Sequence, residues 1–168
     1  VLLEKHGSYY LEALTESIHD IRGGNPKAAF EKLELDLENI RLAWTWGLGQ
    51  RQFETLFLAL EPLHRFIDAR GRSEEGAAMV SKAIAAIDET NPKEQRFLAH
   101  LYLRLSSYKH WIGNFEVAEA LNQKAFNVLE TVDDPLGLMS AVQGLTETAL
   151  KRGNYDQAIE LEERAVAL

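Results

Sequence analysis

Three glycine-centred turns divide the second half of the chain at nearly constant spacing. They are Gly71-Arg72-Ser73, Gly113-Asn114-Phe115 and Gly153-Asn154-Tyr155. A turn that recurs about every 40 residues is typical of stacked helix–turn–helix units, each of which buries its apolar face against the next. The spacing therefore predicts an array of paired helices, a fold that presents surface rather than a chemical centre.

Small residues recur at fixed distances after each turn. One set lies three positions beyond the turn and a second set lies seven positions further on. The first set is Gly76, Ala118 and Ala158, and the second set is Ala83, Ala125 and Ala165. The distance between two packed helices depends on the side chains at their contact, so small residues here indicate closely packed helix pairs.

The chain is predicted to be all-α, with about eight helices. Prolines at positions 26, 92 and 135 each follow Asn or Asp, a pattern typical of helix starts. A break is also expected at Gly47-Leu48-Gly49. The expected helices are 2–20, 26–48, 51–70, 73–89, 92–112, 114–131, 135–152 and 154–168.

Two tryptophans mark the helix expected over 26–48. Trp44 and Trp46 are two positions apart, about 200° around a helix, so they face opposite sides. We expect one to lie in the core and the other to pack beneath the first helix, against Tyr9 or Tyr10.

Two regions are expected along the chain. Residues 1–50 form an N-terminal helical pair that caps or joins the array, and residues 51–168 form three repeats, at about 51–91, 92–133 and 134–168. The chain lacks an initiator Met and ends within a helical pattern at Leu168. We therefore expect a fragment of a longer protein, whose truncated last repeat leaves an apolar side available for self-association.

Composition excludes several classes of function. The chain has no cysteine, which excludes disulfides and thiolate metal sites. Its net charge is −8 and its Lys and Arg residues do not cluster, so nucleic-acid binding is not expected. No apolar run is long enough for a membrane span. We expect a soluble cytoplasmic protein.

Catalytic and cofactor motifs are missing. The chain has no G-x-x-x-x-G-K-S/T loop for nucleotide phosphates. Its five histidines include no pair at i, i+4, the spacing that would place two metal ligands on one helical face. The carboxylates fit the solvated sides of amphipathic helices. We therefore expect no enzyme activity, no cofactor and no metal.

The turns and the small residues after them resemble the tetratricopeptide repeat, from Phe57 onward. Leu63, Leu105 and Leu145 match the leucine of the first helix of that repeat, and Ser106 and Thr146 replace the adjacent small glycine. The resemblance implies a right-handed α-α superhelix of helical hairpins. A period of about 40 residues is similar to the longer variant of the repeat found in bacterial STAND-type signal-transduction ATPases.

The first 50 residues resemble a more specific group of proteins. Segments 6–11, 33–41 and 43–46 resemble the region that joins an ATPase module to its sensor repeats in LuxR-type and SARP-type transcriptional regulators and in the maltose-regulon activator. The resemblance implies a sensor or interaction arm of a larger bacterial regulator. A stand-alone adaptor that holds a peptide or partner helix in its groove stays open, as does, more remotely, a helical enzyme domain.

The expected binding surface is the concave face lined by the first helix of each repeat. Its ligand is expected to be a protein, a peptide or a small-molecule inducer. Arginine and tryptophan are common binding anchors, which makes Arg104, His110 and Trp111 the most suggestive residues. The structural alternative is that Trp111 covers the seam between repeats and Arg104 pairs with a carboxylate. Repeat register predicts that the face comprises Arg65, Asp68, His100, Leu103, Arg104, Ser107, His110, Trp111, Gln143, Glu147 and Lys151.

Overall fold

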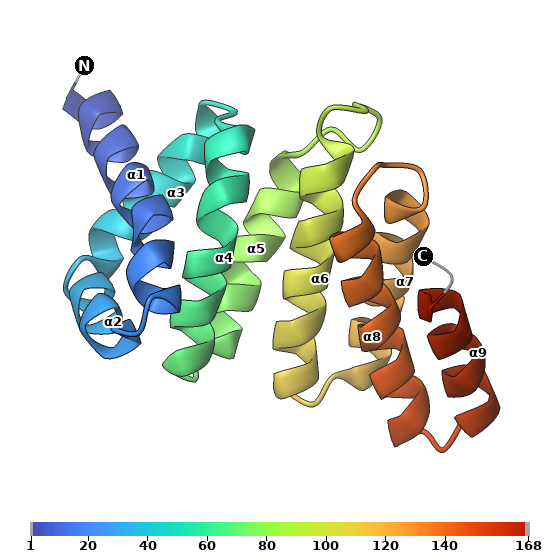
Figure 1. Ribbon diagram of the computed structural model, residues 1–168. Coiled ribbons are helices and arrows are strands. Elements are labelled where there is room, and N and C mark those ends of the chain that lie inside the picture. The colour runs from blue at the N-terminus through green and yellow to red at the C-terminus, as the bar shows by residue number, and fades with distance from the viewer. Residues whose placement is uncertain (1, 167–168) are drawn as a thin grey trace. The chain divides into compact units, whose positions relative to one another are not determined.

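A computed structural model describes residues 2–166, with side chains as far as Arg164. Within this range the chain is all-helical, which confirms the predicted fold class, and it forms nine helices (Figure 1). Their bounds are α1 (Leu2–Arg22), α2 (Pro26–Leu35), α3 (Leu37–Gly49), α4 (Phe53–Ala69), α5 (Ser73–Ala86), α6 (Gln95–Trp111), α7 (Phe115–Leu129), α8 (Pro135–Lys151) and α9 (Tyr155–Val166). Residues 167–168 of the last expected helix lie outside the described range.

The chain divides into two compact units between Arg72 and Ser73. The first unit holds α1 to α4, and the second holds α5 to α9. The spacing of the turns predicts a boundary after residue 50. Within the first unit α4, which belongs to the expected first repeat, packs against both α1 and α3.

In the first unit, α1 packs against α2, α3 and α4. Trp44 is 1% exposed and lies in the core, whereas Trp46 lies against α1 at Gly7. A Cβ atom at Gly7 would be 2.2 Å from Cε3 of Trp46. The structure thus confirms one core tryptophan and one beneath the first helix, but the contact is at Gly7 rather than at the neighbouring tyrosines.

The single helix expected over 26–48 is wrong, because the chain breaks at Asp36. The Asp36 N–H donates to Lys32 O at 3.2 Å and closes α2, while Asp36 O accepts from Ile40 N–H at 2.9 Å and opens α3. Aspartate is a weak helix former, which favours a break at this position, although the carboxylate of Asp36 makes no cap hydrogen bond to the described residues. This break accounts for the additional helix.

The three proline-marked helix starts differ in their capping. At Asp134 the carboxylate accepts from Gly137 N–H at 2.9 Å, as a capping side chain does. Asn25 precedes α2 without a side-chain cap bond to the described residues. At Asn91 the side chain bonds to Glu94 at 2.6 Å within a turn, and α6 begins only at Gln95, later than the expected start at Pro92.

In the second unit, α5 packs on α6, and α6 to α9 pack in sequence, with α6 also touching α8. The predicted small residues are buried at these contacts: Ala83 and Ala125 are 0% exposed and Ala118 is 1% exposed. The side chain of Ala165 lies outside the described part. The burial of these small residues confirms the predicted close packing of the helices.

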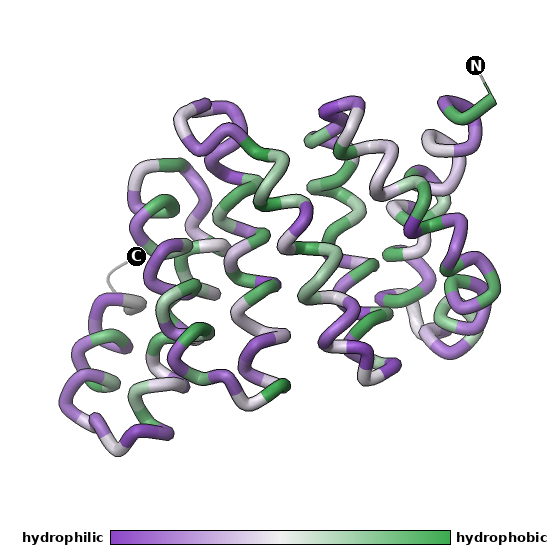
Figure 2. Tube along the Cα trace, turned by 180° about the vertical axis from the view of Figure 1, so that it is seen from behind, coloured by the Kyte–Doolittle hydropathy of each residue, from purple (hydrophilic) through white to green (hydrophobic). Residues whose placement is uncertain are grey.

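Hydrophobic and hydrophilic residues alternate along the helices, as amphipathic helices require (Figure 2). Leu63, Leu105 and Leu145, the leucines that match the repeat pattern, are all buried. None of the helices within residues 2–166 combines the length and apolar character needed to cross a bilayer.

One kind of turn ends the helix before each predicted glycine. Gly113 has φ 86°, its N–H donates to His110 O at 2.9 Å, and the next N–H donates to Lys109 O at 2.8 Å. Gly71 and Gly153 have φ of 63° and 75° and form the same two bonds. This is the Schellman motif, which satisfies the last helical carbonyls and needs a left-handed residue.

A fourth copy of this turn has no glycine. Arg51 has φ 54°, its N–H donates to Leu48 O at 3.1 Å, and Gln52 N–H donates to Gly47 O at 2.9 Å. The break expected at Gly47-Leu48-Gly49 therefore falls slightly later, between Gly49 and Phe53, since both glycines belong to α3. Gly47 is needed for packing, because a Cβ there would be 2.9 Å from Cδ1 of Leu11.

Replacing Arg51 with glycine should stabilise the first unit. A left-handed conformation costs a non-glycine residue about 1 kcal/mol, part of which is offset by the contact of Arg51 with Phe53. We expect Arg51→Gly to raise the free energy of unfolding by about 0.5 kcal/mol in urea titrations followed by circular dichroism. Gly113→Ala should instead lower it by about 1 kcal/mol. Equal effects of the two changes would contradict the assigned turn.

The two glycines of α3 should respond oppositely to alanine. Gly47→Ala should destabilise the chain by roughly 1–3 kcal/mol, because its methyl group meets Leu11 and Leu56. At Gly49 the added Cβ meets no described atom within 4 Å outside its chain neighbours and its own helix backbone, so Gly49→Ala should stabilise the helix by up to about 1 kcal/mol. Thermal unfolding of both variants measures the difference, and a neutral Gly47→Ala would show that α1 and α3 are not so close.

Candidate functional site

A buried aspartate ties α6 to the start of α8. Asp134 Oδ2 accepts hydrogen bonds from Arg96 Nε at 2.7 Å and from His100 Nε2 at 2.8 Å, and its Oδ1 accepts from Gly137 N–H at 2.9 Å. The side chain is only 4% exposed. Asp134 therefore sets the spacing of the two helices at one end.

The ionisation of Asp134 and of His100 follows from their surroundings. Burial opposes ionisation of Asp134, but the hydrogen bonds from Arg96, His100 and Gly137 outweigh it and lower its pKa to about 2. Burial also lowers the pKa of His100, against the effect of Asp134, and the charges of Arg104 and Arg96 add to that lowering. Acid therefore weakens this link between α6 and α8.

Beyond this link, α6, α7 and α8 enclose a groove of about 490 Å³, a volume within the usual range for ligand pockets. We call it the α6–α8 groove. Eight of its lining residues belong to the face predicted from repeat register, and four do not. The eight are Leu103, Arg104, Ser107, His110, Trp111, Gln143, Glu147 and Lys151, and the four are Ser106, Asn122, Ser140 and Gly144.

Aromatic and charged side chains gather at the C-terminal ends of α6 and α8. Lys151 Nζ donates to His110 Nε2 at 2.5 Å and lies 3.3 Å from Glu147 Oε1. The His110 ring meets Trp111 and Phe115 edge-on, with centroids 6.1 and 5.1 Å apart. Trp111 is 67% exposed, so it does not serve as buried packing in a seam between repeats.

The floor of the groove contains a buried amide that sequence inspection missed. Asn122 of α7 is 6% exposed, and its Nδ2 lies 2.3 Å from where a Cβ at Gly144 would be. Gly144 therefore leaves room for this amide beneath α8. A glycine inside the apolar-periodic segment 135–152 was the available signal, but the sequence did not show which residue faces it.

The groove carries more positive than negative charge within a chain of net charge −8. Arg104 and Lys151 are cations, whereas Glu147 is the lone carboxylate among the lining residues. Arg104 lies close enough to His100 for its charge to affect the pKa of that imidazole. The arrangement suits an anionic group held near an exposed aromatic ring.

Three residues of the predicted face lie elsewhere. His100 bonds to Asp134 and does not line the groove. Arg65 and Asp68 are on α4 in the first unit, where Arg65 Nε donates to Glu61 at 2.9 Å and Asp68 is exposed. The same Glu61 accepts from Arg22 at 2.7 Å, and these two arginines lower its pKa against the effect of burial. The Arg22–Glu61 pair therefore links α1 to α4, whereas Arg65 bonds within α4.

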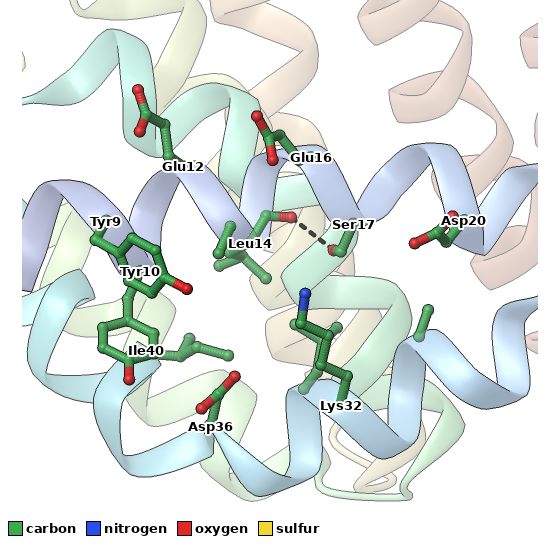
Figure 3. Close-up of a pocket in the computed structure, with 13 residues that line it drawn as sticks. Tyr9, Tyr10, Glu12, Leu14, Glu16, Ser17, Asp20, Lys32, Asp36 and Ile40 are labelled. Carbon is green, nitrogen blue, oxygen red and sulfur yellow. Dashed lines mark hydrogen bonds between the residues drawn. The ribbon is translucent and has the colours of Figure 1, made fainter.

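The first unit has its own hollow, of about 210 Å³, between α1 and the α2–α3 segment. Figure 3 shows Tyr10 and Ser17 of α1 beside it, with Lys32 and Asp36 extending from the opposite wall. Ser17 Oγ donates to Leu14 O at 2.6 Å, so its hydroxyl is used within α1. Carboxylates dominate the rim, as on a solvated seam between helices, and the larger α6–α8 groove remains the candidate site.

Comparisons with known proteins support the fold. Neither the models of known protein families nor the curated proteins gave a match. The crystal structure of BtubC (BKLC) from P. vanneervenii is similar to this chain, with a TM-score of 0.59 and 16% sequence identity. The similarity covers 99% of this chain and 73% of that one. At this identity it shows the helical fold alone.

Removal of the Asp134 carboxylate should destabilise the second unit in a pH-dependent way. Its pKa falls from 3.8 to about 2 on folding, so the carboxylate contributes about 2 kcal/mol above pH 4, and this is lost as the pH falls toward 2. In urea titrations, the free energy of unfolding of Asp134→Ala should be lower by about that amount at pH 7. The deficit should shrink between pH 4 and pH 2.

The exposed neighbour Asp133 supplies the control, although its side chain is less buried than that of Asp134. Asp133→Ala should change the free energy of unfolding by less than about 0.5 kcal/mol. Equal losses at the two positions, or a deficit at Asp134 that does not vary with pH, would contradict the proposed link between α6 and α8.

Proposed function

We propose that this chain is a non-catalytic binding arm that holds a segment of a partner protein in the α6–α8 groove. The observation that carries the proposal is the convergence of Arg104, Trp111 and Lys151, from two successive repeats, on one open groove. Arginine and exposed tryptophan are the side chains that most often dominate binding energy at interfaces. The favoured partner is an extended acidic segment, because the groove has excess positive charge.

The groove offers three kinds of contact to such a segment. The exposed face of Trp111 supplies apolar area, Arg104 and Lys151 supply donors for carboxylates, and the buried amide of Asn122 supplies directed hydrogen bonds at the floor. This combination of an apolar surface with a few placed polar groups is typical of ligand sites. A small-molecule inducer carrying an anionic group would use the same contacts.

The wider role that we propose is a sensor or interaction arm of a larger cytoplasmic bacterial regulator. The tetratricopeptide-like turns and the resemblance of residues 1–50 to a joining segment support this assignment, and the arm would then be a right-handed superhelix beside an ATPase module of STAND type. A ligand would act by binding one arrangement of the arm more tightly than another.

The alternative is a stand-alone adaptor that captures a peptide terminus. Asn122, Arg104 and Lys151 in one groove favour it, since an amide and two cations suit a terminal carboxylate. Both proposals use the same groove, and the sequence that flanks this segment in its gene separates them: an adjoining ATPase domain supports the regulator, and its absence supports the adaptor.

A peptide-display selection tests binding in the groove. Random peptides selected on the immobilised chain should be enriched in Asp and Glu, and should bind it reversibly in fluorescence anisotropy. Arg104→Ala and Trp111→Ala should each weaken this binding at least about ten-fold, or about 1.4 kcal/mol, because each removes an anchor.

Lys82→Ala on α5 is the matched control, since this exposed cation lies outside the groove. It should leave binding unchanged. Failure to enrich any peptide, or selected peptides that bind all three variants as tightly as the unaltered chain, would rule out the groove as the site.

A further inference from the structure

A second surface, on α8 and α9, is more apolar than the groove. Leu150, Tyr155 and Ile159 are 49%, 65% and 59% exposed and line a hollow of about 710 Å³, which Glu162 and Glu163 border. Thr146 also lines it: the residue is 6% exposed, and its hydroxyl has no hydrogen-bond partner among the described residues. A buried hydroxyl without a partner is costly; one repeat earlier the equivalent hydroxyl, of Ser106, donates to Ala118 O at 2.8 Å. We call this surface the α8–α9 face.

The equivalent face one repeat earlier is covered by a helix. A shift by one repeat relates Leu150, Tyr155, Ile159 and Glu162 to His110, Phe115, Glu119 and Asn122. On that earlier face α8 is seated, with Gly144 against the Asn122 amide. Arg152, just after α8, pairs with Glu119 at 2.5 Å, and Lys151 lies 5.2 Å from the Phe115 ring centroid.

We propose that the α8–α9 face binds an amphipathic helix of the α8 type. Such a helix lies across this face as α8 lies across the earlier one, but it carries other side chains at the points of contact. Two positions that are polar on the covered face, His110 and Glu119, become Leu150 and Ile159 here, so the partner must supply apolar side chains opposite them. Glu162 and Glu163 call for Lys or Arg on its flank.

Charge argues against a second copy of the same face as the occupant. Face-to-face pairing of two chains would bring Glu162 and Glu163 of both copies into one interface whose lining residues include no cation to pair with them, which is unfavourable. A basic helix avoids this repulsion and also covers the apolar side chains. The occupant is therefore an amphipathic helix with basic residues beside its apolar side chains, rather than an identical face.

A suitable probe is a synthetic peptide with the sequence of residues 135–152 and the changes Gly144→Lys, Lys151→Leu and Arg152→Leu. On the earlier face these three residues meet Asn122, His110 and Glu119, which correspond to Glu162, Leu150 and Ile159 here. Labelled with fluorescein, the peptide should bind the full chain saturably in anisotropy titrations at low salt. Ile159→Asp should weaken binding at least ten-fold, since it places a charge in the apolar hollow. Glu162→Lys combined with Glu163→Lys should weaken it several-fold and reduce its dependence on salt.

Two controls test whether binding is specific to this face. Leu136→Asp alters a similarly exposed apolar residue outside the face and should leave peptide binding unchanged, as should Trp111→Ala in the α6–α8 groove. Circular dichroism checks that each variant is folded. Absence of binding, or binding that Ile159→Asp leaves intact, would overturn the proposal. Sedimentation showing a dimer of the chain that Ile159→Asp dissociates would also overturn it, in favour of a second copy.

Discussion

The rest of this fold depends on one backbone turn, in which a single residue of positive φ ends a helix and returns two N–H groups to its last carbonyls. The turn occurs at Arg51, Gly71, Gly113 and Gly153. In the second unit it reverses the chain within a few positions at Gly113 and Gly153, so the next helix packs back on the one just completed. Small residues such as Ala118 then lie at the contact, and the helices can approach closely.

The α6–α8 groove follows from that geometry. A shift by one repeat relates Trp111 to Lys151, and each is the last residue of its helix before the turn. The repeat therefore brings an aromatic ring and a cation to the same end of neighbouring helices. Asp134 fixes the other end of the pair, and the approach of Gly144 to Asn122 sets the depth between them. The site is thus made by repetition, with different side chains at equivalent positions.

Much of this arrangement could be predicted from the sequence, because glycine turns and apolar periodicity are local signals. The all-helical class, the turns at three glycines and eight residues of the groove were predictable in this way. The turn at Arg51 was not, since a residue with a side chain adopts the left-handed region there, and the break at Asp36 carries no glycine or proline to mark it. Asn122 was missed because its role depends on a glycine in another helix, and the placement of α4 depends on contacts with α1.

Amide hydrogen exchange measured by NMR tests the account most directly. The N–H groups of Gln52, Arg72, Asn114 and Asn154 lie just beyond helix ends, where amides ordinarily exchange fast, yet each donates to a carbonyl of the preceding helix at 2.8–3.0 Å. The account predicts that these four amides are protected to a similar degree as the last turn of the helix they close. Exchange at the rate of an unstructured peptide at these positions, beside protected helices, would contradict it.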